Sequence, residues 1–191
     1  MGKPTIATVT ALIAALVLGM AGCKEGDLLQ GTISPAEASF AEDDSDGVID
    51  HLVTLEQNSV SGGRIVLDVV ITEVDEPITG IALKLTYPDG FSKFVECLDG
   101  DLFPSGTCYY DEPASGSGEV FVGRFLTGAG QTVTVDGPRV AVRLEFLVFG
   151  EGDGVIRIEA QNLAGGEASA VLDGNGDPVF MQWFSGLLSG T

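Results

Sequence analysis

The feature that most constrains the fold of this chain is an alternation of apolar and other residues with a period of two. It is clearest in four segments: 64–71 (RIVLDVVI), 80–87 (GIALKLTY), 139–149 (RVAVRLEFLVF) and 154–160 (GVIRIEA). Because successive side chains of a β-strand point to opposite faces of its sheet, these segments are predicted to be half-buried strands. The residues expected on the buried face are Ile65, Leu67, Val69, Ile71, Ile81, Leu83, Leu85, Tyr87, Val140, Val142, Leu144, Phe146, Val148, Ile156 and Ile158.

Shorter segments with strand character lie between these four. They are 51–55, 93–97, 119–126, 131–135, 168–172 and 179–184. Turn-forming sequences such as SGG, YPDG, SGSG, TGAG, VDGP, EGDG and DGNGDP separate the strands, and no stretch after residue 28 has a helical period. Frequent turns between many short strands are typical of β-sandwiches. We therefore predict an all-β sandwich of nine or ten short strands over residues 48–191.

The N-terminal 22 residues differ in composition from the rest of the chain. They hold one basic residue, Lys3, no acidic residue, and an apolar run over 6–18. About 20 apolar residues are needed to span a bilayer, so this run indicates a cleaved signal peptide and not a permanent anchor. The sequence Met20-Ala21-Gly22-Cys23 resembles the signal of bacterial lipoproteins. An ordinary signal peptide followed by an incidental cysteine is the alternative.

The lipoprotein resemblance implies that Cys23 becomes the acylated N-terminus of an exported protein. Lys24, where an Asp would favour retention, implies sorting to the outer membrane if the host is a diderm bacterium. Several acyl chains anchor stably, because each buried CH₂ contributes about 0.8 kcal/mol. Residues 23–47 are rich in Gly, Ser, Pro and acids, so we predict that they form a flexible tether.

The charge of the chain is strongly negative. All 28 acidic residues and eight of the nine basic residues follow Gly22, and the whole chain has a formal charge of −19. Such a balance opposes binding to nucleic acids and to anionic membrane surfaces. It is compatible with Ca²⁺ or with a basic partner, although acidity alone identifies neither.

Two cysteines remain in the predicted domain. An exported chain meets an oxidising compartment, so Cys97 and Cys108 are expected to form a disulfide, with two free buried thiols as the alternative. His51 is the only histidine and lies far from both in sequence. We therefore predict no zinc site.

Segment 51–160 resembles cohesin domains, the exported bacterial modules that bind dockerins. The resemblance rests on an order of strands: LVTLEQNSVSGGRIVLDVVITEV, PITGIALKLTYPDGFSKFVECLDGDLF, GEVFVGRFLTGAG and GPRVAVRLEFLVFGEGDGVIRIE, with AVLDGNGDPVFMQW as a final hairpin. Tyr87-Pro88-Asp89 departs from the family's Tyr-Asp-Pro order. The resemblance implies a nine-stranded jelly roll that binds a protein partner, such as a dockerin-bearing one, through one sheet face. The alternatives are a carbohydrate-binding module that binds polysaccharide and a structural component of the envelope.

Candidate site residues come from three segments. Asp173, Asn175 and Asp177 have the spacing of Ca²⁺ ligands, but Pro178 and Trp183 break the loop pattern, so a hairpin turn is favoured over a weak Ca²⁺ site. Trp183 belongs either to the core or to a surface that stacks on sugars. The remaining candidates, in the segment between the two cysteines and just after it, are Phe103, Tyr109 and Tyr110, which either form a binding surface or pack across their loop.

The sequence offers little support for catalysis. It contains no G-x-S-x-G, H-E-x-x-H or P-loop motif. Paired carboxylates could serve a glycosidase, but a chain with 28 acidic residues contains many such pairs by chance. We therefore predict a protein that is not an enzyme.

Overall fold

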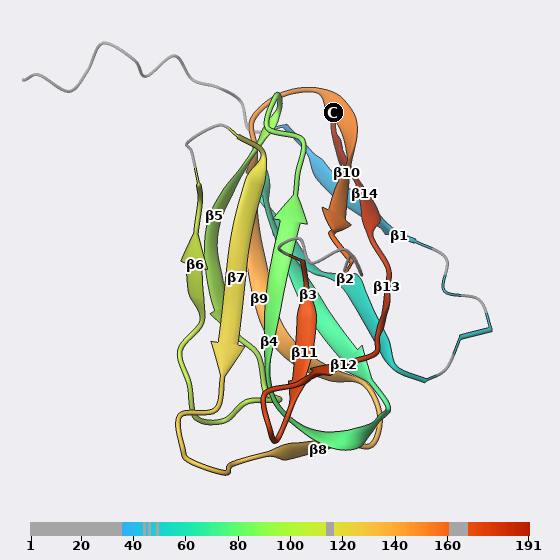
Figure 1. The fold of residues 1–191 in the computed structure, drawn as a ribbon. Helices are drawn as coiled ribbons and strands as arrows, with labels where there is room; N and C mark the ends of the chain where they lie inside the picture. Colours follow the sequence, from blue (N-terminus) through green and yellow to red (C-terminus); the bar gives the residue numbers. More distant parts are fainter. Residues whose placement is uncertain (1–35, 44, 46, 49, 114–116, 161–167) are drawn as a thin grey trace, which may run out of the picture. The chain divides into compact units, whose positions relative to one another are not determined.

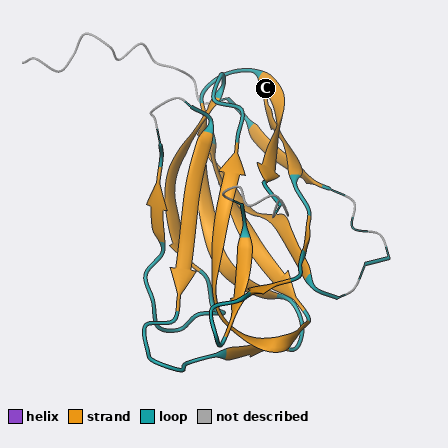
Figure 2. Ribbon diagram, in the orientation of Figure 1, coloured by secondary structure: helices purple, strands orange, loops and turns teal. Residues whose placement is uncertain are grey.

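The computed structural model describes residues 36–43, 45, 47–48, 50–113, 117–160 and 168–191. The predicted signal peptide, Cys23 and the first part of the predicted tether lie outside these residues. Within them the chain forms fourteen strands in two sheets and no helix (Figures 1 and 2). It follows that the described part holds no helix able to cross a membrane. The prediction of an all-β sandwich is confirmed.

The larger sheet has nine strands and is organised around β4 (Val74–Thr86). One path through it runs β1-β14-β10-β4-β11-β12, and β7 joins β4 to β6 while β8 pairs with the beginning of β4. The other members are β1 (Ala38–Glu42), β6 (Tyr109–Asp111), β7 (Glu119–Phe125), β8 (Val133–Val135), β10 (Gly152–Ile158), β11 (Ala170–Asp173), β12 (Pro178–Val179) and β14 (Gly186–Gly190).

The smaller sheet has five strands in the order β13-β2-β3-β9-β5. These are β13 (Gln182–Trp183), β2 (Leu52–Ser61), β3 (Arg64–Thr72), β9 (Arg139–Val148) and β5 (Ser92–Asp99). All pairs in this sheet are antiparallel except β13 with β2, which is parallel. The strand count exceeds the predicted nine or ten partly because several strands have only two or three residues.

The core lies between the inner faces of the two sheets. The alternating residues of β3 and β4 predicted to be buried are buried, and the rings of Phe94, Phe146 and Tyr87 pack edge to face at its centre. Val140 is the exception among the predicted core residues, because it is only half-buried and its neighbour Ala141 is buried instead. A bulge causes this, since Val69 and Val70 of β3 pair with Val142 and Val140 and leave Ala141 unpaired.

Two predicted boundaries are wrong. Segment 179–184 is not one strand: β12 pairs with β11 in the larger sheet and β13 pairs with β2 in the smaller one. The chain crosses between the sheets at Phe180, which is 78% exposed, and Met181, which is buried. The predicted tether also extends too far, because β1 pairs with β14 in register and therefore belongs to the domain.

Candidate functional site

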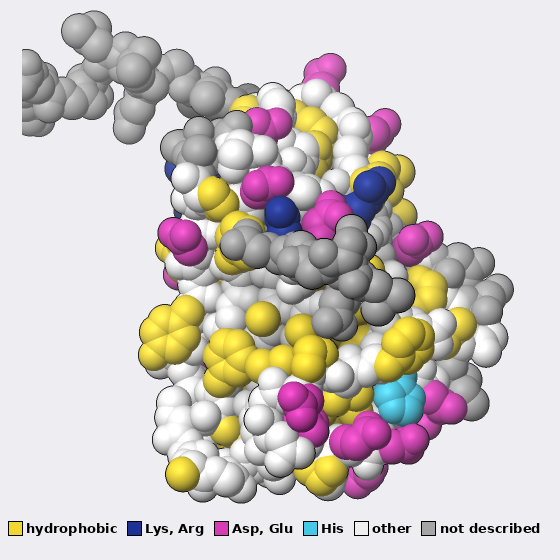
Figure 3. All heavy atoms as spheres, viewed as in Figure 1, with side chains coloured by type: hydrophobic (Ala, Val, Ile, Leu, Met, Phe, Trp, Pro, Cys, Tyr) yellow, Lys and Arg dark blue, Asp and Glu magenta, His cyan; other side chains and the backbone are white. Residues whose placement is uncertain are grey.

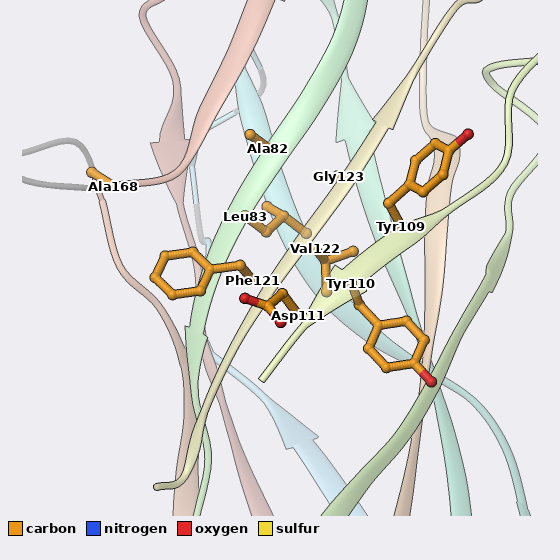
Figure 4. A pocket seen from close by; sticks show the side chains of 9 residues that line it. All are labelled: Ala82, Leu83, Tyr109, Tyr110, Asp111, Phe121, Val122, Gly123 and Ala168. Atoms are coloured by element: carbon orange, nitrogen blue, oxygen red, sulfur yellow. The ribbon is translucent and has the colours of Figure 1, made fainter. Parts of the chain in front are cut away.

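The outer face of the larger sheet carries an open depression over β4, β6 and β7. Its volume is about 640 Å³, and its lining residues are Ala82, Leu83, Tyr109, Tyr110, Asp111, Phe121, Val122, Gly123 and Ala168 (Figure 4). We call this depression the tyrosine groove. Hydrophobic side chains gather across the same face in Figure 3.

The register of the strands explains why the groove is hollow. Tyr109 of β6 pairs with Gly123 of β7, Gly123 pairs with Ala82 of β4, and Ala82 pairs with Ala170 of β11. These residues form one row across four strands, in which three successive positions have a hydrogen atom or a methyl group as side chain. Small side chains leave a shallow floor, and the exposed ring of Tyr109 stands at one end of it.

One wall of the groove is formed by the next row along the strands. Asp111 of β6 pairs with Phe121 of β7, which in turn pairs with Lys84 of β4. The Lys84 ammonium lies 5.5 Å from the centre of the Phe121 ring and 3.9 Å from a Glu119 carboxylate oxygen. A cation over an aromatic face is attracted by its quadrupole, so Lys84 helps to fix the Phe121 ring.

On the opposite side of the small-residue row, the Phe125 ring lies against the sheet. A methyl group placed on Gly80 would lie 2.2 Å from Cδ1 of Phe125, and one on Gly123 would lie 3.0 Å from Cε2. Neither glycine has the positive φ that would demand it for backbone reasons. Their role is therefore to let the ring approach the backbone closely.

β6 supplies Tyr109, Tyr110 and Asp111 and is fixed at both ends. At its start, a disulfide joins Cys108 to Cys97 of β5 in the other sheet, with Cα atoms 5.9 Å apart. Beyond its end, Glu112 accepts a hydrogen bond of 3.1 Å from the Tyr87 hydroxyl. Burial, reinforced by this hydrogen bond and by the Glu112 charge, raises the pKa of Tyr87 to about 12. The hydroxyl therefore stays protonated and able to donate.

The two tyrosines have different roles. Tyr109 is 65% exposed and belongs to the groove row, whereas Tyr110 packs edge to face on the core residue Phe94 with ring centres 5.2 Å apart. The two rings project in different directions from β6 (Figure 4). Tyr109 is therefore placed where it can contact a ligand, and Tyr110 has a packing role against β5.

The loop before β6 is held by a buried arginine. Arg124 of β7 is 3% exposed, and its guanidinium donates hydrogen bonds to the carbonyl oxygens of Gly100, Phe103 and Ala141. Its Nε has no hydrogen-bond acceptor but lies 3.6 Å from Asp99 Oδ1. Arg124 therefore joins β7 to β9 in the other sheet and to the chain leading towards Cys108.

Two aromatic candidates do not belong to the groove. Phe103 is completely buried, so it is a core residue and not part of a binding surface. Trp183 is half-buried in β13, in the smaller sheet, and packs against the core. The groove instead uses Phe121, Ala82 and Gly123, which sequence reasoning missed. Their only sequence signal is that they occupy the outward positions of β4 and β7.

The DGNGDP segment forms the turn between β11 and β12. The Asp173 carboxylate accepts hydrogen bonds from the backbone N–H groups of Asn175 and Asp177, both at 2.8 Å, and from the Asn175 side chain. These N–H donors hold the pKa of Asp173 below its usual value. Both oxygens of this carboxylate are thus engaged within the turn.

His51 stands apart from the groove, at the start of β2. Its Nε2 lies 3.9 Å from carboxylate oxygens of Asp75 and Glu76. Across the described ranges, no group of three His, Cys, Asp or Glu side chains is placed to hold a metal ion.

The fold resembles that of several solved proteins. A type I cohesin–dockerin complex from Clostridium thermocellum matches with a TM-score of 0.54 and 17% identity, over 70% of this chain and 95% of that one. A type II cohesin from the cellulosome of Acetivibrio cellulolyticus matches with a TM-score of 0.53 and 15% identity, over 72% and 95%. A cohesin module of a Clostridium perfringens family 33 glycoside hydrolase matches with a TM-score of 0.51 and 11% identity, over 82% and 96%.

No family model matches the sequence, and neither does any curated protein. The likeness therefore concerns the three-dimensional arrangement of the strands. The domain formed by the described residues has the fold of a cohesin domain.

Proposed function

We propose that this chain is a non-catalytic exported module that holds a protein partner in the tyrosine groove. The observation that carries the proposal is the groove itself, an open apolar surface with a small-residue floor on a paired sheet. Strands of a sheet keep such a surface in one shape, so little conformational entropy is lost when a partner binds.

The chemistry of the groove fits a protein partner. Aromatic residues, tyrosine above all, are enriched at the centres of protein interfaces, and polar groups surround them. Here the Tyr109 ring and the Phe121 ring flank the floor, with the Asp111 carboxylate and the Lys84 ammonium beside them. The cohesin fold favours a dockerin-bearing partner, since the Clostridium thermocellum cohesin was solved with a dockerin.

The partner should carry a basic group close to its apolar contact surface. The chain has 28 acidic and nine basic residues, and Asp111 is an exposed carboxylate at the groove. Complementary charge raises the association rate and fixes the orientation of the partner. The same negative balance argues against nucleic acid as a partner.

The location is part of the proposal. We infer from Met20-Ala21-Gly22-Cys23 that Cys23 is acylated and anchors the protein to the cell envelope, at the outer membrane if the host is a diderm bacterium. Mass spectrometry of the membrane fraction should find the lipidated peptide that begins at Cys23. An unmodified mature form in the soluble fraction would contradict this part of the proposal.

The function is tested by capturing partners with the domain, residues 36–191, from the exported proteins of the source organism. We expect one protein to be retained, and the variant Tyr109→Ala to lose it. Leu187→Ser is the matched control, because Leu187 is 41% exposed but lies on β14, away from the groove. Equal capture by all three forms would refute the groove as the binding site.

Capture is repeated with Ca²⁺ and with a chelator. We propose no cofactor for this chain, because both oxygens of the Asp173 carboxylate already accept hydrogen bonds within the turn. The cohesin resemblance implies a partner with paired Ca²⁺-loop helices. Binding should then fail in chelator, while the melting temperature of this domain alone stays unchanged.

A second candidate function is supported by one observation. The exposed Tyr109 ring lies two residues from Asp111 on the same face, and a ring beside a carboxylate also suits a sugar. A carbohydrate-binding module would be retained on polysaccharide and released by soluble sugars, whereas a protein partner would stay bound. A structural envelope component would bind nothing added and would co-purify with an envelope complex.

A further inference from the structure

We propose that β6 is a detachable edge strand and that the Cys97–Cys108 disulfide holds it in place, so the tyrosine groove is complete only in the oxidised chain. The claim that the disulfide controls partner binding rests on the proposed function. The structural claim itself, that reduction releases β6 and leaves the sandwich folded, stands independently of any partner.

The first support is that β6 buries little apolar surface that could hold it. It has three residues, all exposed, and it pairs only with β7. No residue from Pro104 to Pro113 is buried. Burial of apolar surface is the main force that holds a segment to a domain, and this segment has very little of it.

The second support is that a few specific links replace burial. The disulfide ties Cys108 to β5, and the Cys108 N–H donates to the Asp99 carboxylate at 3.2 Å. Tyr110 packs on Phe94, and Glu112 accepts from Tyr87. Among these links the disulfide is the only covalent bond. It fixes the start of β6 to β5, so the segment can move away from the domain only after the bond is broken.

The third support is that the core does not need β6. None of the core residues comes from β6, and the loop before it is anchored by its own buried residues, Leu102 and Phe103. Arg124 binds the carbonyls of Gly100 and Phe103 without involving either cysteine. Release on reduction should therefore begin after Phe103 and spare what precedes it.

The redox step is simple. The disulfide accepts two electrons and two protons from a dithiol reductant, which becomes a disulfide itself, and Cys97 and Cys108 become thiols. Thiols are kept reduced in the cytosol and oxidised outside it. A precursor inside the cell would therefore lack an ordered Tyr109 and Asp111, and the groove would form only after export.

The test follows the domain by NMR and amide hydrogen exchange before and after reduction with a dithiol. In an edge strand only alternate N–H groups face the neighbouring strand, so we expect the β6 amides that bond to β7 to exchange roughly tenfold or more faster in the reduced protein. The contact between the Tyr110 and Phe94 rings should disappear. Amides of β3 and β9 should keep their protection.

Two outcomes would overturn the proposal. If β6 keeps its protection and its ring contact after reduction, the disulfide does not hold it. If β3 and β9 lose protection together with β6, the strand is not separable from the fold. The variant Cys97→Ser/Cys108→Ser repeats the measurement without reductant, and Thr107→Ala, at an exposed position of the same loop, is a control that keeps the disulfide.

A comparison with the capture experiment separates this proposal from the proposed function. If reduction releases β6 but partner capture is unchanged, the strand is detachable and Tyr109 does not belong to the binding surface. Capture by the oxidised form alone, together with release of β6 on reduction, would support both.

Discussion

The close contact between Gly80 and Phe125 makes a quantitative prediction about the wall of the groove. The two residues are cross-strand partners on β4 and β7, and the ring lies where a Gly80 side chain would be. In Gly80→Ala the new methyl group would lie 2.2 Å from Cδ1 of Phe125 and 2.7 Å from the Arg124 carbonyl oxygen. Both distances are too short, so the ring must turn away and the backbone must shift.

The cost has two parts that can be separated. Overpacking of this kind costs about 1–3 kcal/mol, and we expect about 2 kcal/mol for Gly80→Ala because a ring and a backbone atom must both move. Phe125 is 38% exposed, so Phe125→Ala alone should cost only about 1 kcal/mol. In the Phe125→Ala background the ring contact is gone, and Gly80→Ala should cost about 1 kcal/mol less than in the wild type.

The assay is a double-mutant cycle measured by urea unfolding, with melting temperature as a second readout. A loss of 2 kcal/mol corresponds to a fall of roughly 4–8 °C for a domain of this size. Gly90→Ala is the matched control, because a methyl group there would meet nothing within 4 Å. Equal costs of Gly80→Ala in both backgrounds would show that the ring does not determine the need for glycine.

Four further predictions concern the core, the groove, the Tyr87 hydroxyl and the turn. Phe103→Ala should cost about 3–5 kcal/mol of unfolding free energy because the ring is completely buried, whereas Tyr109→Ala should change thermal stability little while abolishing capture of the partner. Because folding raises the pKa of Tyr87 from 10.0 to about 12, its contribution to stability is complete below pH 10 and is lost as the pH rises towards 12. Tyr87→Phe should therefore flatten the alkaline limb of a plot of stability against pH. Folding lowers the pKa of Asp173 below 3.8, so its contribution is present above that pH and is lost as the pH falls through the folded value. Asp173→Ala should accordingly speed amide exchange in the β11–β12 turn at neutral pH, and an unchanged rate would contradict this role.

The strand interiors and the fold class could be predicted from the sequence because they depend on local alternation. Leu83, Leu85 and Leu144 lie between polar or small neighbours, and a period of two is sufficient to place them in the core. The alternation fails at Val140, where a bulge shifts the register by one residue. A bulge depends on the partner strand, so a local pattern does not reveal it.

The groove was harder to predict because it depends on residues that are small. Sequence reasoning selected large aromatic side chains, which found Tyr109 but also selected Phe103 and Trp183, whose rings lie in or against the core. Ala82 and Gly123 become part of a site only because the register places them side by side. Strand pairing between segments forty residues apart is not encoded in either segment alone.

The arrangement of the larger sheet also relates the groove to the ends of the domain. Glu37 and Thr191 exchange backbone hydrogen bonds of 2.9 and 3.0 Å, so the chain enters the described domain beside the place where it ends, on β1 and β14. β10 joins β14 to one edge of β4, whereas β7 and β6 continue the sheet from β4 in the other direction. An attachment that reaches the domain through β1 therefore arrives at the edge of the sheet remote from Tyr109. β1 is itself paired in register with β14 along its whole length, so it is held to this edge of the sheet. The lipid anchor proposed at the N-terminus and the partner site proposed on β6 and β7 would therefore engage different edges of the same sheet.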